Sequence, residues 1–298
     1  MADFSVSTSI TLMRQTAPFV AFRVVVYFAI AVAYVLATGT GAGIGWGVGA
    51  FGDDDFRAGA TAWGGAIGFG ATAAVLYFLR EYILYMVKAG HVAVMVELLD
   101  DRELPEGKGQ IAYAQDIVKQ RFGQANVLFA IDQLVKGVVR AISGLVQGLV
   151  SILPIPGVNG LMQLVRSFLK VAVGLIDEVI LAHSMRIRSE NPWASSRDAL
   201  VLYGQNAKPM IFNAAWIALI TYVLAFIVFL LMLAPAGAVV YAIPGAWSAG
   251  GFVFAILFAW AVKAALIEPF AIACLLQAFF KVTEGQTPKP DWVAKLDS

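Results

Sequence analysis

The sequence contains few of the residues that build disulfides, metal centres and acid-base sites. Its 298 residues include one cysteine, Cys274, and two histidines, His91 and His183, which are far apart in the chain. A single cysteine excludes an intramolecular disulfide and a cysteine metal cluster. HxxxH, HExxH and GxSxG motifs and a phosphate-binding loop are all missing from the sequence. We therefore expect no catalytic residue, no metal and no cofactor, and predict that the protein is not an enzyme.

Charge is also scarce. Only 14% of the residues are charged, the formal net charge is +1, and neither end carries an acidic or basic tail, so we expect no nucleic-acid partner. Hydrophobic residues make up 60% of the chain, and the mean hydropathy is +0.77. A soluble domain of this size does not need so much apolar surface, which indicates that lipid is part of the solvent. The composition predicts an all-α, polytopic membrane protein whose partners include membrane lipids.

Four apolar runs are long enough to cross a bilayer, which takes about 20 helical residues. They cover residues 18–37, 60–87, 210–233 and 252–280. Glycine-rich or proline-containing segments, 38–52 and 234–251, separate the members of each pair and are expected to form outer loops. The remaining flanks carry most of the lysines and arginines, so the positive-inside rule predicts that both termini and the central region are cytoplasmic. The first apolar run is expected to be retained, in an inner or plasma membrane.

The two apolar hairpins share an order of features. Each begins after a proline and resumes at a Gly-Gly pair after its outer loop. Each then carries two glutamates at the same spacing of 16 residues: Glu81 with Glu97, and Glu268 with Glu284. This pattern favours an internal duplication in one orientation, although unrelated hairpins with glycine-rich turns share some of these features. We predict three parts: a first hairpin in 1–109, a central region in 110–207 and a second hairpin in 208–298.

The central region is expected to be helical and amphipathic. Residues 110–122 have an apolar face and a polar face, which is typical of a helix on the membrane surface. Two further runs, 126–153 and 158–185, are joined by a proline-rich turn, and each is apolar except for one stripe at helical spacing. This hairpin can insert into the bilayer or lie flat at its surface. The sequence therefore allows either four or six membrane-inserted helices, and we favour six.

Ionisable residues within the apolar runs are the main functional candidates, because charge inside a bilayer is costly and usually faces protein or water. In the spans these are Arg23, Arg80, Glu81, Lys263 and Glu268; in the central stripes they are Asp132, Lys136, Arg140, Lys170 and Asp177. Asp177 is expected to pair with Lys136 or Lys170 across the central hairpin.

Glu268 precedes a proline in the last apolar run. The proline lacks an amide hydrogen, so the helix should loosen there and leave a carbonyl unbonded. A carboxylate at such a kink could form a site for an ion or a cationic substrate. The alternative is that Arg80, Glu81 and Glu268 lie near the cytoplasmic ends of their spans, where they pair with one another or reach water.

Residues 166–292 carry a partial family resemblance. An amphipathic basic helix is followed by Ser196-Arg197-Asp198-Ala199-Leu200, with Asn206 shortly before a span. The last span runs into Gln277-Ala278-Phe279-Phe280 and a polar exit, Glu284-Gly285-Gln286-Thr287-Pro288. This order resembles the C-terminal region of the choline-transporter-like family. The resemblance implies solute movement without fixing choline as the substrate. Members of that family are larger, with more spans and a sizeable outer domain.

Two functions follow from these features. The first is a transporter or channel-like protein that moves a small solute or ion, with polar stripes that could line a pore in a homo-oligomer. The second is a non-catalytic scaffold or accessory subunit of another membrane complex. Lipid handling is a third reading that the sequence leaves open.

Overall fold

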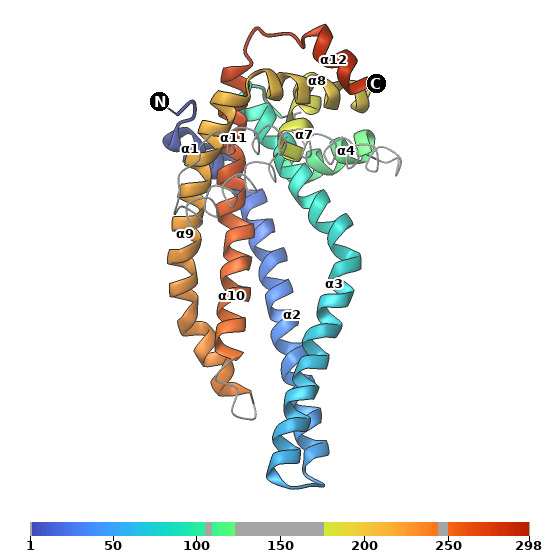
Figure 1. Ribbon diagram of the computed structural model, residues 1–298, viewed down its shortest axis with the longest axis vertical. Coiled ribbons are helices and arrows are strands. Elements are labelled where there is room, and N and C mark those ends of the chain that lie inside the picture. The colour runs from blue at the N-terminus through green and yellow to red at the C-terminus, as the bar shows by residue number, and fades with distance from the viewer. Residues whose placement is uncertain (1, 105–108, 123–175, 244–249, 298) are drawn as a thin grey trace, which may run out of the picture. The chain divides into compact units, whose positions relative to one another are not determined.

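The computed structural model describes residues 2–104, 109–122, 176–243 and 250–297 (Figure 1). Every regular element in these ranges is a helix, as predicted. In chain order the helices are α1 (Val6–Gln15), α2 (Ala17–Gly49), α3 (Asp54–Leu99), α4 (Gln110–Phe122), α7 (Ile176–Arg186), α8 (Pro192–Gln205), α9 (Ala207–Ala242), α10 (Gly250–Val262), the π-helix η1 (Lys263–Ile267), α11 (Glu268–Val282) and α12 (Pro290–Asp297).

Within the described ranges, four helical segments are long and apolar enough to cross a membrane. They are Ala17–Gly49, Asp54–Tyr77, Ala207–Ala242 and Gly250–Val282. The expected number of four is confirmed, and the chain has the helices of a multi-pass membrane protein. A count of six stays a prediction, because the two central runs lie largely outside the described residues.

Contacts within the chain group it into two units. The first contains Met1–Pro18, Lys88–Thr221 and Phe270–Ser298, and the second contains Phe19–Val87 and Tyr222–Pro269. Each unit draws its residues from distant parts of the sequence. The three consecutive parts predicted from the sequence, and the duplication of the hairpins, stay predictions.

The first expected outer loop is mostly helix. Residues 38–49 continue α2, and the reversal of the chain is confined to the few residues before α3. The glycines let the backbones of α2 and α3 approach closely: a Cβ built on Gly41 would lie 2.1 Å from the carbonyl oxygen of Gly64, and one on Gly45 would lie 2.0 Å from that of Ala60. Gly41 and Gly45 form a GxxxG pattern, which in membranes favours close helix packing over a loop.

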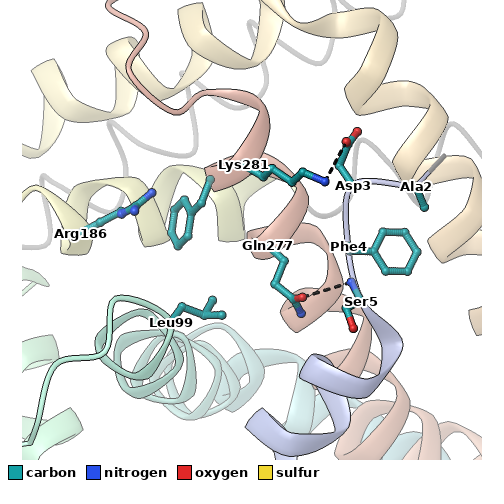
Figure 2. A pocket seen from close by; sticks show the side chains of 9 residues that line it. Ala2, Asp3, Phe4, Ser5, Leu99, Arg186, Gln277 and Lys281 are labelled. Atoms are coloured by element: carbon teal, nitrogen blue, oxygen red, sulfur yellow. Dashed lines mark hydrogen bonds and ion pairs between the residues drawn. The ribbon is translucent and has the colours of Figure 1, made fainter.

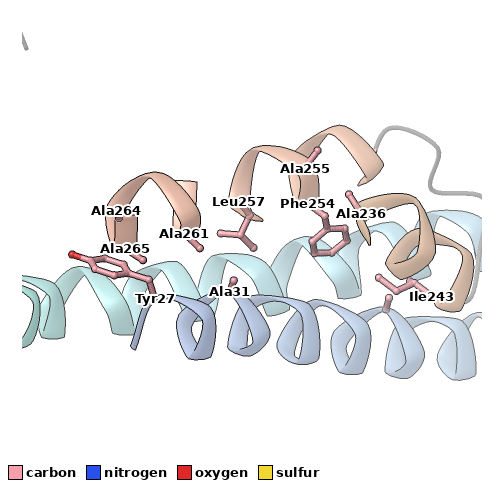
Figure 3. Packing of buried hydrophobic residues seen from close by; sticks show 11 residues of the cluster. Tyr27, Ala31, Ala236, Ile243, Phe254, Ala255, Leu257, Ala261, Ala264 and Ala265 are labelled. Carbon is pink, nitrogen blue, oxygen red and sulfur yellow. The ribbon is translucent and has the colours of Figure 1, made fainter. Parts of the chain in front are cut away.

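The second expected outer loop is also shorter than predicted. Helix α9 passes through Pro235 and ends at Ala242. A proline is tolerated inside a membrane helix where neighbouring groups satisfy the backbone that it leaves unpaired. An apolar cluster formed by α2, α9 and α10 packs in this part of the chain and includes Ala31, Ala236 and Phe254 (Figure 3).

Two local predictions are confirmed. The amphipathic segment is helix α4 over Gln110–Phe122, with Ala114 and Val118 buried and Lys119 exposed. The irregularity expected before Pro269 is present as η1, whose last residue is followed directly by Glu268.

The glycine contacts predict a paired result. Gly41→Ala would place a methyl group against the backbone of α3, whereas Gly43→Ala meets open space, since nothing lies within 4 Å of its Cβ position. Overpacking of this kind costs about 1–3 kcal/mol, so Gly41→Ala should lower the unfolding temperature in detergent and Gly43→Ala should not. Equal unfolding temperatures for the two variants would contradict the close approach.

Candidate functional site

The second unit contains a buried charged cluster around Arg23 of α2. The Arg23 side chain is 0% exposed, although it belongs to an apolar helix. Its Nη2 donates a hydrogen bond of 2.5 Å to the carbonyl oxygen of Ala264 and lies 3.7 Å from Oε2 of Glu268. The guanidinium carbon lies 5.5 Å from the centre of the Tyr27 ring. A carbonyl, a carboxylate and an aromatic ring therefore surround one cation.

The sequence explains why the Ala264 carbonyl is available. In η1 the backbone bonds span five residues, and the N–H of Glu268 donates to the carbonyl of Lys263. The next bond in that register would run from Pro269 to Ala264, but proline has no N–H. The Ala264 carbonyl would remain unsatisfied in an apolar environment, and Arg23 supplies the missing donor.

The cluster retains further hydrogen-bonding capacity. Among the described residues, Nε and Nη1 of Arg23 have no hydrogen-bond partner. The Glu268 side chain is 23% exposed, so one side of the ion pair reaches the surface of the structure. The cluster can therefore donate hydrogen bonds from a buried cation and accept them at a partly open carboxylate.

Of the other span candidates, Lys263 has a side chain within the described part, whereas Arg80 and Glu81 do not. Lys263 is the first residue of η1 and is half-buried. Arg80 and Glu81 lie on α3, and their side chains are outside the described part. The stripe residues Asp132, Lys136, Arg140 and Lys170 also lie outside the described residues. Glu268 pairs with Arg23, and the expected pairing among Arg80, Glu81 and Glu268 stays a prediction because it involves side chains outside the described part.

Asp177 and its neighbour Glu178 form a second charged cluster, in the first unit. Lys88 of α3 forms an ion pair with Glu178 of α7, and its Nζ lies 3.7 Å from Oδ2 of Asp177. Glu178 is 1% exposed. Burial raises the pKa of Glu178 well above its usual range, while the Lys88 ammonium opposes the rise. The described partner of Asp177 is Lys88, whereas Lys136 and Lys170, the predicted partners, lie outside the described residues.

A third cluster, missed by the sequence analysis, surrounds the end of α3. Glu97 pairs with Arg102 at 2.9 Å and with Arg188 at 3.5 Å, and it accepts a 3.0 Å hydrogen bond from the Tyr113 hydroxyl. Burial and the Glu97 carboxylate raise the pKa of Tyr113 to about 12. Acidic groups at a helix C-terminus oppose the helix dipole, so these cations offset an unfavourable position. The charged residues near the ends of α3 and α7 were the signal in the sequence that could have indicated this cluster.

Two similar helix caps bring those arginines together. At the end of α3 the backbone N–H of Arg102 donates to the backbone carbonyl of Glu97, and Asp101 has φ 51°. At the end of α7 the backbone N–H of Ser189 donates to the backbone carbonyl of Ser184, and Arg188 has φ 49°. This is the bonding pattern of the Schellman motif, in which glycine usually takes the left-handed position. Arg188 adopts this left-handed conformation although it is not glycine, and its side chain forms an ion pair with Glu97.

Both histidines lie in the first unit, where His91 is buried and His183 is half-buried. Nε2 of His91 lies 2.9 Å from the Thr16 hydroxyl. The ring of His183 packs edge-on against Phe279 at 6.0 Å, and burial lowers the pKa of His183. In the part of the chain that the structure describes, no three His, Cys, Asp or Glu side chains are grouped so that they could hold a metal ion.

The fold and these clusters define a multi-pass helical membrane protein in whose apolar part a buried arginine pairs with a partly exposed glutamate. Comparisons with protein-family models, with curated proteins and with solved structures found no match to this chain.

The Arg23 cluster predicts a strong coupling in stability. Glu268→Gln leaves the buried cation without its carboxylate, a loss that typically costs about 3–5 kcal/mol for fully buried pairs and less here because Glu268 is 23% exposed. Arg23→Met combined with Glu268→Gln should cost less than the sum of the two single changes. A double-mutant cycle of unfolding free energies measures the coupling, and strict additivity would contradict the pair.

His183 predicts a pH dependence of stability. The pKa of His183 in the folded chain lies below its ordinary value of 6.5, so folding favours the neutral ring. This contribution is complete above pH 6.5 and is lost as pH falls toward the lowered pKa. Unfolding temperatures should therefore fall more on acidification in the wild type than in His183→Leu, which cannot bind the proton. Parallel curves for the two proteins would refute the assignment.

Proposed function

We propose that the chain moves a small solute or ion across the bilayer, with the Arg23–Glu268 cluster as a polar point on its path. The observation that carries this proposal is the burial of Arg23 inside an apolar helix, where it contacts a carbonyl freed by a π-helix and a proline. Charges within membrane helices are costly and cluster along the paths of ions and solutes. Single-turn π-helices inside α-helices are frequent at functional sites.

The Ala264 carbonyl gives Arg23 one structural role, but stability alone is a weak reason to keep the ion pair with Glu268. Replacing a buried ion pair by apolar residues of similar volume is often neutral or stabilising. An apolar side chain at position 23 would also remove the two guanidinium nitrogens that lack a partner among the described residues. Burying these two nitrogens without a hydrogen-bond partner costs free energy. A polar solute that contacts them during transport would explain why they are kept.

The resemblance of residues 166–292 to the choline-transporter-like family adds support for solute movement and leaves the solute open. We further propose that both termini are cytoplasmic and that the protein forms a homo-oligomer. The lysines and arginines of the flanks favour that orientation through the positive-inside rule. No catalytic step is part of the proposal.

A scaffold or accessory subunit is the second candidate. It is favoured by Ile187 and Trp193, which are 50% and 45% exposed in the first unit outside the four candidate spans. Exposed apolar side chains mark a protein interface where they join into one patch, so this candidate expects Ile187 and Trp193 to lie within a partner contact. A scaffold would retain a different membrane protein at fixed stoichiometry after purification.

Flux into proteoliposomes tests the proposal. Labelled choline, rubidium and iodide serve as probes for an organic cation, an inorganic cation and an anion, with empty liposomes as the baseline. Glu268→Gln should reduce the protein-dependent flux about tenfold, as expected for the loss of one contact to a charged group. Glu284→Gln is the matched control, because Glu284 is exposed beyond the end of α11.

Equal flux in the two variants, with folding intact, would remove the Arg23–Glu268 cluster from the path. No flux of any probe above the baseline, together with a stoichiometric partner protein, would favour the scaffold instead.

A further inference from the structure

A pocket of about 390 Å³ lies in the first unit, beside the N-terminal segment (Figure 2). Its walls come from the residues before α1, from the end of α3, from the end of α7 and from the last turns of α11. Two cations line it, Arg186 and Lys281, together with the apolar side chains of Phe4, Leu99 and Phe280. A cationic pocket with apolar walls suits an anionic group attached to an apolar body.

The guanidinium of Arg186 is held in place before any ligand binds. Its Nε and Nη2 contact the Asp100 carboxylate at 3.1 Å and 2.8 Å. Its guanidinium carbon lies 4.1 Å from the centre of the Phe280 ring. Since one edge faces Asp100, the edge that carries Nη1 is directed away from that carboxylate. A planar, fixed guanidinium is the side chain best suited to a phosphate group.

Lys281 supplies a more mobile charge. Its side chain is 64% exposed and forms a loose ion pair with Asp3, at 3.5 Å. An exposed pair of this kind contributes little stability, so an incoming anion can take Lys281 from Asp3 at small cost. Asp3 is the acidic residue of the pocket wall, and its charge limits the site to one anionic group.

The wall that carries Asp3 is firmly attached. The backbone N–H of Asp3 donates to Asn213 at 2.7 Å, and the Asn213 amide donates to the Asp3 carboxylate at 2.8 Å. The N–H of Ser5 donates to Gln277 at 3.2 Å (Figure 2). The N-terminal segment is therefore a fixed wall, and the pocket does not depend on a ligand for its shape.

The pocket is lined by residues at the end of a candidate membrane span, which indicates that it lies near the membrane surface. Lys281 is the penultimate residue of the candidate span Gly250–Val282. Helix α1, which begins at the pocket, exposes Val6 and Ile10, each 45% accessible, and such apolar side chains on a short amphipathic helix suit the boundary of a bilayer. Lipid headgroups are found at this depth.

We propose that the pocket between Arg186, Lys281 and the N-terminal segment binds a phosphate group, as carried by the headgroup of an anionic phospholipid. Arg186 and Lys281 contact the phosphate, and Phe4 and Leu99 contact the glycerol and upper acyl carbons. This proposal does not rest on transport, because a scaffold could carry the same site.

Titration of the full chain in detergent tests the site. The probes are short-chain phosphatidylglycerol, the matching diacylglycerol without phosphate, and inorganic phosphate at constant ionic strength, with bound species counted by native mass spectrometry. Lys281→Gln should weaken phosphatidylglycerol about fivefold, and Arg186→Gln with Lys281→Gln should weaken it further. Lys208→Gln with Lys289→Gln removes two exposed lysines that do not line the pocket and should leave the affinity unchanged.

The single variant Lys281→Gln guards against misfolding, because this exposed side chain makes only a loose pair. Competition by inorganic phosphate would show that the phosphate group suffices, and its absence would assign the site to the lipid headgroup. Two results would overturn the proposal: the same phosphatidylglycerol affinity in wild type and Lys281→Gln, or diacylglycerol bound as tightly as phosphatidylglycerol.

Discussion

The hydrogen bond from Arg23 to the carbonyl of Ala264 satisfies the constraint that governs the second unit. A lipid environment offers no water to an unpaired backbone group. Pro269 leaves such a group, the carbonyl of Ala264, in the last span because proline has no N–H. Arg23 donates the missing hydrogen bond to this carbonyl but also brings a positive charge into the apolar part of the chain. The carboxylate of Glu268 offsets that charge. Proline, carbonyl, guanidinium and carboxylate are thus linked in sequence, and removing Arg23 or Glu268 leaves another group of the cluster without its partner.

The sequence predicts this arrangement only in part. Hydropathy identifies the four spans, and amphipathic spacing fixes α4, because both follow from local composition. Proline chemistry predicts an irregular helix before Pro269. The partner of Glu268 could not be predicted in the same way, since Arg23 lies 245 residues away in the sequence and only the fold brings the two together.

The glycine-rich segment after the first span shows where local rules mislead. In water, glycine favours turns because it adopts positive φ without steric cost, and it is costly inside a helix because it loses the most conformational freedom on folding. Between membrane helices the same residue removes a side chain that would separate two backbones, as Gly41 and Gly64 do at their contact. The GxxxG spacing was the available signal, and it requires the segment to be read as helix first.

Arg23 and Lys281, the cations of the two proposed sites, differ in how far they reach water, and this difference separates their proposed roles. Arg23 is fully buried and tied to one carbonyl, so a polar ligand reaches it only through a rearrangement of its surroundings. Lys281 is 64% exposed and loosely paired, so an anion can bind it when its side chain leaves Asp3, with no change in the helices around it. A buried charge that must rearrange suits a step in solute movement, whereas an accessible cation beside apolar walls suits equilibrium binding of a headgroup.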